Sequence, residues 1–165
     1  MNIVVLAGGL STERDVSLNT GTMVSKALRS KGHNVIMLDV FMGYHEEEED
    51  ITDIFNHTEE ASADVAQIPG EAPDIAQVKA MRKDQSACFF GPNVIKICQA
   101  ADIVFMALHG ENGENGKIQA AFDLFGIQYT GSRYLGSALA MDKGISKKMF
   151  EASRRPSGLR RQRRR

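Results

Sequence analysis

Short apolar runs alternate with segments of helical spacing over the first 40 residues of the chain. Residues 3–7 form an apolar, β-branched run that stops at two glycines, and residues 35–40 form a second such run. Both runs predict buried parallel strands. Between them, residues 16–30 carry apolar side chains on one helical face, and Gly32 follows where helices commonly end. Strand, glycine-rich turn, helix and strand in this order predict a βαβ unit, and hence an α/β domain.

The second half of the chain returns to this alternation. Two apolar runs predict strands, over residues 102–108 and 127–130. Four further segments predict helices, namely residues 94–101, 118–125, 134–141 and 143–152.

Residues 43–86 interrupt the pattern and predict an elaborated acidic surface connection with room for one short helix. From residue 44 onward, eight acidic side chains precede Asp64, and this segment holds no lysine or arginine. Such a run predicts a solvated face. Because four adjacent glutamates do not provide the spaced ligands of an EF-hand, the run does not predict a calcium site.

The composition is that of a folded globular protein, with 42% apolar and 25% charged residues over 165 positions. Cys88 and Cys98 lack metal-site spacing, so they predict two reduced, buried thiols rather than a disulfide or zinc site. The first residues lack the basic segment and apolar core of a signal peptide, and no apolar run approaches a membrane span. We therefore expect a cytoplasmic protein without a membrane partner.

The net charge of −1 combines two unlike parts. Residues 151–165 hold seven arginines and one glutamate, whereas the first 150 residues hold 13 basic and 20 acidic side chains. Residues 153–165 contain one large apolar side chain, so this Arg-rich tail is expected to be disordered. Its abrupt composition favours a shifted reading frame or a truncated gene model. The alternative is a basic arm that binds nucleic acid, since arginine runs neutralise phosphates.

Two glycine-rich loops, residues 8–17 and 109–116, follow predicted strands. Ligands of parallel sheets bind at the carboxyl ends of the strands, where glycine lets the backbone approach closely. The first loop lacks G-x-G-x-x-G, and Asp39 only weakly matches the acid expected after the second strand. The sequence also lacks G-x-x-x-x-G-K-[ST], so nicotinamide-type and Walker-type nucleotide sites have little support.

The first loop carries four candidate side chains. Glu13 either faces a ligand ammonium and orients a catalytic hydroxyl, or only complements the helix dipole, and its position alone does not separate these roles. Asp15 better suits a capping role, and Arg14 suits a surface pair with either acid. Ser17 is predicted as an N-cap in preference to a substrate contact.

The later candidates are His109, beside Gly110 at a strand end, and Lys143 after a helix break. His109 suits a ligand contact and a structural role equally well. Lys143 suits either a phosphate contact or a solvated surface position.

Together, these motifs resemble the D-alanine–D-alanine ligases. VVLAGGLSTERDVSLNTG at residues 4–21 resembles the opening of that family, and ALHGENGENGKIQ at residues 107–119 resembles its first signature. YTGS at residues 129–132 and SALAMDK at residues 137–143 are similar to its passage into the ATP-binding part. Asn115 stands where the family usually has aspartate, and this change is isosteric.

The resemblance implies a Rossmann-like parallel sheet, the pre-ATP-grasp N-terminal domain, over residues 1–133. Residues 134–152 would begin the central ATP-grasp domain, which this chain leaves incomplete. The family joins two D-alanines through an acyl phosphate, with ATP and Mg²⁺ or Mn²⁺, in peptidoglycan precursor synthesis. The homodimer is its expected assembly. The family's second substrate, D-alanine, D-lactate or D-serine, is not fixed by this part of the sequence.

The resemblance also implies roles for individual residues. Glu13 would hold the ammonium of the first D-alanine and support catalysis, and His109 would lie near that substrate's carboxylate. Ser17 and Gly110 would complete the D-alanine site, and Lys143 would reach the nucleotide phosphates. The metal ligands of the family match no position in this chain.

Three hypotheses follow. The chain is a ligase by descent and is inactive alone, or a non-catalytic module that binds a small molecule, or a fragment that binds nucleic acid through its tail.

Overall fold

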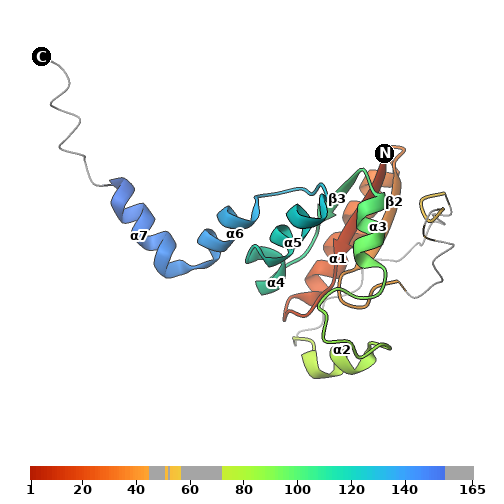
Figure 1. Cartoon of the computed structure of the whole chain (residues 1–165), viewed down its shortest axis with the longest axis horizontal. Helices are drawn as coiled ribbons and strands as arrows, with labels where there is room; N and C mark the ends of the chain where they lie inside the picture. Colours follow the sequence, from red (N-terminus) through yellow and green to blue (C-terminus); the bar gives the residue numbers. More distant parts are fainter. Residues whose placement is uncertain (45–50, 52, 57–71, 155–165) are drawn as a thin grey trace, which may run out of the picture.

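Three parallel strands form the sheet of the computed structural model, which describes residues 1–44, 51, 53–56 and 72–154. The central strand is β1, with β2 and β3 on either side (Figure 1). The strands are β1 (Asn2–Ala7), β2 (Asn34–Asp39) and β3 (Ile103–Met106). The described helices are α1 (Arg14–Arg29), α2 (Ile75–Met81), α3 (Val94–Ala100), α4 (Glu111–Glu114), α5 (Lys117–Phe125), α6 (Tyr134–Met141) and α7 (Lys143–Arg154). The predicted α/β fold with a parallel sheet is confirmed.

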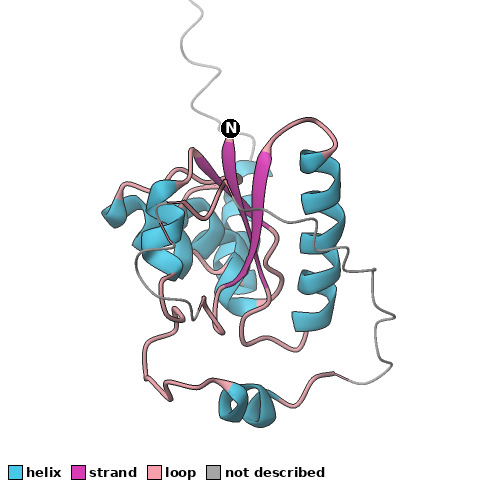
Figure 2. Cartoon of the chain, turned by 90° about the vertical axis from the view of Figure 1, so that its right-hand side faces the viewer, coloured by secondary structure: helices cyan, strands magenta, loops and turns pink. Residues whose placement is uncertain are grey.

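The two faces of β1 pack against different helices, because successive side chains of a strand point to opposite faces. Ile3, Val5 and Ala7 belong to a core cluster with apolar side chains of α1. Val4 and Leu6 belong to the other cluster, with side chains of α3 and α5. Figure 2 shows the sheet between these helix layers. Burial on both faces explains why this strand is a continuous apolar run rather than an alternating one.

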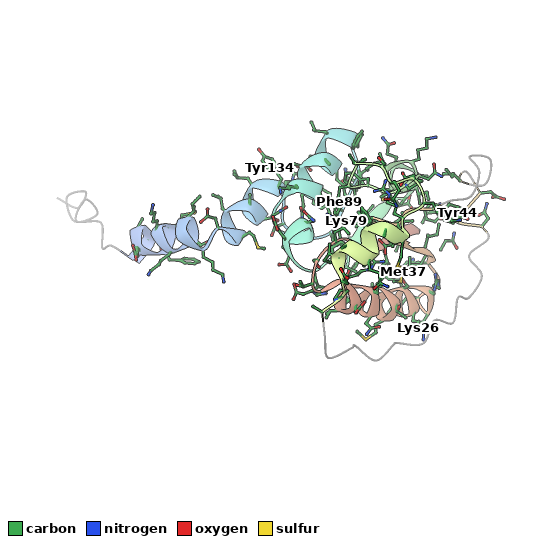
Figure 3. The ribbon with its side chains drawn as sticks, turned by 90° about the horizontal axis from the view of Figure 1, so that it is seen from below. Lys26, Met37, Tyr44, Lys79, Phe89 and Tyr134 are labelled. Carbon is green, nitrogen blue, oxygen red and sulfur yellow. The ribbon has the colours of Figure 1, made fainter. Side chains whose placement is uncertain are left out.

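Helix α1 presents small residues to the sheet. Ser17, Gly21 and Ser25 are buried along its inner side. A Cβ at Gly21 would lie 2.8 Å from the Ala7 Cβ and 3.0 Å from the Met37 Cε, so glycine lets the helix approach the strands closely. Figure 3 labels Met37 beside this helix.

For most elements, the predicted bounds lie within two residues of those in the structure. Helix α1 begins at Arg14 rather than at residue 16. The strand predicted over residues 127–130 is reduced to one parallel bridge between Val104 and Tyr129. Gly126 and Gly131 flank this segment with φ values of 69° and 101°, and these turns leave only a short extended stretch between them.

The connection over residues 43–86 contains the one short helix predicted for it, α2, in its described part. Asp74 caps α2, because its Oδ1 accepts hydrogen bonds from the backbone N–H groups of Ala76 and Gln77. The acidic run of residues 46–50 lies outside the described residues.

The connection is not wholly a surface feature. Ile51, Ile54 and Phe55 are buried in the core cluster beside Val4 and Leu6. The expectation of a surface connection is therefore wrong for these apolar side chains. Their spacing of three and four positions places them on one side of a helical turn, and this suits them to cover the sheet.

Arg82, directly after α2, fastens the connection to the rest of the fold. Its guanidinium is 2% exposed, pairs with Asp84 at 2.5 Å and lies 4.8 Å above the ring of Phe41. It also donates to the carbonyl oxygens of Cys88 and Phe90. Each of the three guanidinium nitrogens of Arg82 therefore donates to a carboxylate or carbonyl oxygen.

Helices α6 and α7 extend away from the sheet, as the blue segments of Figure 1 show. α6 has the predicted bounds, and α7 runs two residues further than predicted, to Arg154. The arginine-rich segment from residue 155 onward lies outside the described residues. Among the described helices, none has the length and apolar character needed to cross a membrane.

Both cysteines are free, and they differ in burial. Cys98 is buried as predicted, and the apolar surroundings raise the pKa of its thiol to about 12. Cys88 is exposed, so the prediction of a second buried thiol is wrong. Cys88 lies between α2 and α3, just after the connection, where no periodicity indicated its exposure.

Candidate functional site

Both glycine-rich loops leave the same edge of the sheet, because β1 and β3 are parallel neighbours. Ser17 joins their starting points. Its Oγ accepts a hydrogen bond from Gly8 N–H at 2.9 Å and donates one to the Ala107 carbonyl at 2.8 Å. The side chain is fully buried. One hydroxyl of α1 therefore fixes the end of β1 against the end of β3.

Ser17 is not the predicted N-cap. Glu13 occupies that position, and its side chain makes no capping hydrogen bond. Ser17 lies in the first turn of α1, and its hydroxyl has one donor and one acceptor partner in the two loops. Its contact with substrate stays a prediction, and the geometry shows a residue that positions backbone.

The first loop is braced by Asp39, at the end of β2. Gly8 and Gly9 have φ values of 75° and 86°, and a Cβ at Gly8 would lie 2.3 Å from Asp39 Oδ2. Asp39 Oδ1 accepts from Gly9 N–H at 3.3 Å, and Asp39 Oδ2 pairs with Arg14 Nη2 at 2.5 Å. The Arg14 guanidinium also donates to the Gly9 carbonyl at 2.8 Å. The expected pairing of Arg14 with Glu13 or Asp15 is therefore wrong.

The Asp39 carboxylate is fully committed to these contacts. Besides Gly9 and Arg14, it accepts from the N–H groups of Phe41 and Met42 at 2.9 and 3.1 Å. A dinucleotide site of the Rossmann type uses the corresponding acid to bind a ribose hydroxyl. Asp39 instead organises the protein's own loop, and this agrees with the weak sequence match.

The second loop brings His109 and Gly110 against the first. Ser11 Oγ donates to the His109 carbonyl at 2.8 Å and accepts from Glu13 N–H at 3.2 Å. Gly110 has φ 81°, and a Cβ there would meet the Ser11 Cβ at 2.8 Å and Glu13 Oε2 at 3.1 Å. Only glycine fits between the two loops at this point. The structure therefore brings Glu13, His109 and Gly110 together.

The side chain of Thr20 also belongs to this cluster and was missed. Thr20 Oγ1 lies 3.1 Å from His109 Nε2 and 2.9 Å from the Val16 carbonyl. Thr20 follows Ser17 by three positions, so both lie on the same side of α1. The spacing of three positions could have predicted that Thr20 and Ser17 share a side of the helix, but only with the helix start at Arg14 known.

Lys143 lies apart from these loops. It is exposed at the start of α7, in the extension that leaves the sheet (Figure 1). It lines a pocket of about 420 Å³ together with Ala140, Ser146, Lys147, Phe150 and Glu151. A phosphate contact there stays a prediction.

A further pocket, of about 350 Å³, adjoins the first loop and was not predicted. Lys79 and Phe89 line it and lie close together in Figure 3. Leu10 comes from the glycine loop, Arg82 comes from the connection, and Cys88 lies just after it. The charge of Arg82 is already compensated by Asp84 and backbone carbonyls, so this pocket offers no free buried charge to a ligand.

Within the described ranges, no group of three histidine, cysteine or acidic side chains is arranged to hold a metal ion. The edge of the sheet where the two loops meet carries other functional groups. It presents a carboxylate and an imidazole around glycine-lined backbone. That set suits a small zwitterion better than a cation or a dinucleotide.

The fold is an α/β domain in which two glycine-rich loops meet at one edge of a parallel sheet. The family model described as "D-ala D-ala ligase N-terminus" matches residues 2–132. The chain belongs to this family.

Relatives and solved structures agree. The D-alanine–D-alanine ligase of Pediococcus pentosaceus is 48% identical over 151 residues, which are 91% of this chain and 42% of that protein. The ligase of Lacticaseibacillus casei is 45% identical over 153 residues, with the same shares. The ligase of Bacillus anthracis complexed with ATP has a similar fold, with a TM-score of 0.54 at 24% identity over 93% of this chain and 37% of that one. The chain spans about 42% of the length of these curated relatives.

Proposed function

We propose that this chain is the amino-terminal portion of an ATP-dependent ligase that joins two D-alanines, and that its strand-end loops bind the first D-alanine. One observation carries the proposal. The fold brings Glu13 Oε2 to the close-fitting Gly110 beside His109, from two loops far apart in the sequence. These are the residues to which the family resemblance assigns that substrate.

The two side chains suit the two charges of an amino acid. The carboxylate of Glu13 attracts the ammonium, and the ring of His109 provides a nitrogen for the carboxylate. Charge-assisted hydrogen bonds of this kind are stronger than neutral ones. Gly8, Gly9 and Gly110 let the ligand approach the backbone, because no Cβ stands in the way.

A carboxylate is a poor acyl donor until one oxygen becomes part of a phosphate leaving group. In the whole ligase, ATP would supply that phosphoryl group, and Mg²⁺ or Mn²⁺ bound with it would neutralise the charge. The residues described in this chain do not form a metal-binding group, so we assign it no metal-dependent step. We propose Lys143 as a contact to the nucleotide phosphates, in a pocket that it shares with Lys147.

The remaining proposals follow from the family. We place the whole enzyme in the cytoplasm, as a homodimer that supplies the dipeptide for peptidoglycan. The chain alone is expected to make no dipeptide.

An NMR titration tests the D-alanine site. In the ¹⁵N-labelled chain, D-alanine should shift the amide signals of Gly8, Gly9 and Gly110, and L-alanine should shift them less. Glu13→Gln should abolish the response, since it removes the charge that faces the ammonium. Asp102→Asn, which changes an exposed acid just before β3, at the opposite end of that strand from the loops, is the matched control and should respond like the wild type.

The alternative is a small-molecule-binding module without chemistry. It shares the D-alanine response, so excluding it needs a second measurement. ADP release that depends on D-alanine in a preparation free of other ligases would show that this chain retains catalysis. Binding without ADP release agrees with both, because the ligase portion is itself expected to be inactive alone.

A further inference from the structure

The hydroxyl of Thr20 lies between a backbone carbonyl and the ring of His109. Its Oγ1 is 2.9 Å from the Val16 carbonyl oxygen, one turn back in α1, and 3.1 Å from His109 Nε2. A hydroxyl has one hydrogen to donate. A carbonyl oxygen only accepts, so the Thr20 hydrogen is directed to Val16. Toward the ring, Thr20 is then an acceptor, and Nε2 must carry a hydrogen.

His109 is held both at its backbone and at its ring. Ser11 donates to the His109 carbonyl at 2.8 Å and fixes its backbone, while Thr20 engages the far nitrogen of the ring. Thr20 is itself restrained, because its branched side chain on a helix has few rotamers and bonds to the previous turn. Its helix is anchored to the ends of β1 and β3 by Ser17. The orientation of the imidazole is therefore determined by α1.

The second ring nitrogen is left for a ligand. In the part of the chain that the structure describes, Nδ1 of His109 has no hydrogen-bond partner. A neutral ring with hydrogen on Nε2 presents a lone pair at Nδ1. A protonated ring presents an N–H donor there. A carboxylate only accepts, so the D-alanine carboxylate bonds to the protonated ring, in which Nε2–H still donates to Thr20 and Nδ1–H is left for the substrate.

We propose that Thr20 is a positioning residue that fixes His109 in the Nε2–H form and thereby makes Nδ1 the nitrogen that meets the substrate. This rests on the proposed function for the identity of the substrate, D-alanine. The choice of tautomer does not depend on it, since it follows from the two distances at Thr20.

Long-range ¹H–¹⁵N NMR of the histidine rings tests the proposal on the whole chain without ligand. His109→Gln identifies the ring signals of His109 among the four histidines. At a pH where the ring is neutral, the wild type should show hydrogen on Nε2. Thr20→Ser should keep this form, because it retains the hydroxyl, and Thr20→Val should give a mixture of tautomers. An Nδ1–H ring in the wild type, or a Thr20→Val ring identical to the wild type, overturns the proposal.

Thr22→Val is the matched structural control. Thr22 also lies in α1 and donates to the carbonyl one turn back, Leu18 O, at 3.0 Å, but its other contact is the sulfur of Met37. Its replacement removes the same kind of helix bond and should leave the His109 tautomer unchanged. The wild-type tautomer tests the proposal even if the Thr20→Val chain fails to fold.

The titration with D-alanine then separates the two proposals. Addition of D-alanine should shift the Nδ1 signal of the wild type, and Thr20→Val should weaken binding about 2- to 10-fold, the range expected for one hydrogen bond. An Nε2–H ring that gives no response to D-alanine refutes the proposed substrate and supports the role of Thr20 in setting the tautomer. A D-alanine response with an Nδ1–H ring refutes the role of Thr20 and supports the proposed function.

Discussion

Replacing Ser17 by alanine should be among the most damaging single changes at the edge of the sheet. The Ser17 hydroxyl accepts from Gly8 N–H and donates to the Ala107 carbonyl, and all of its surface is buried. Alanine fits the same space but satisfies neither backbone group. Both groups would then be buried without their partner, at the point where the two loops begin.

The expected loss of stability can be estimated from these contacts. A buried polar group left without a partner costs about 1–3 kcal/mol, and two are affected here. Alanine recovers about 0.5 kcal/mol through its higher helix propensity. We therefore expect Ser17→Ala to lower the free energy of unfolding by about 1.5–5.5 kcal/mol.

Ser25 provides a matched control on the same helix. It is 1% exposed, and its hydroxyl has no hydrogen-bond partner among the described residues. Ser25→Ala removes the same atom with the same gain in helix propensity, but it relieves an unpaired buried group instead of creating two. This variant should be more stable than the wild type by about 1–2 kcal/mol.

Urea unfolding followed by circular dichroism measures both variants, with the free energy extrapolated to zero denaturant. The two serines should change stability in opposite directions. Equal changes in the free energy of unfolding, within about 0.5 kcal/mol, would refute the hydrogen bonds assigned to the Ser17 hydroxyl. Burial and helix propensity, which the two serines share, would then explain both changes.

Three further predictions concern groups around the site. Arg14→Met should lower stability by about 1–3 kcal/mol in the same unfolding assay, because it leaves the mostly buried carboxylate of Asp39 without its cation; an unchanged midpoint would contradict this. Gly8→Ala should lower it by at least about 2 kcal/mol, since the new Cβ combines a positive φ with a clash 2.3 Å from Asp39 Oδ2. Mass spectrometry after iodoacetamide at about pH 8 should find Cys88 alkylated and Cys98 protected until urea unfolds the chain, because burial raises the pKa of the Cys98 thiol to about 12 and keeps the reactive thiolate scarce.

The strands and most helices could be predicted because their signal is local. An apolar run between glycines is a buried strand wherever it lies, and the bounds of α6 matched the prediction. The burial of Ile54 and Phe55 was not predicted, because the composition around them is acidic. The acidic residues around them dominated the interpretation, although their spacing from Ile51 was a sign of a buried face.

The errors at the site share a different cause. Ser17 has the residue type of an N-cap, and Arg14 stands between two acids, so local rules suggested a cap and a surface pair. In the fold, each instead contacts a residue from another strand end, Ala107 and Asp39. Such contacts depend on strand order and on the start of α1, neither of which a linear pattern defines to the residue. The grouping of the two loops was predictable, because parallel neighbours end at the same edge.

The pattern of contacts at this edge separates residues that build the site from those left to act in it. Ser17, Ser11 and Asp39 direct their side chains to backbone groups of the loops, so the loops are ordered by folding. A ligand then binds without having to order them, and this reduces the entropic cost of association. The Glu13 side chain, by contrast, is exposed and makes no capping bond, and His109 keeps one ring nitrogen without a partner in the described chain. The lack of a capping hydrogen bond, together with the position of Glu13 Oε2 beside Gly110 of the other loop, favours the ligand-binding interpretation of Glu13 over the helix-dipole one.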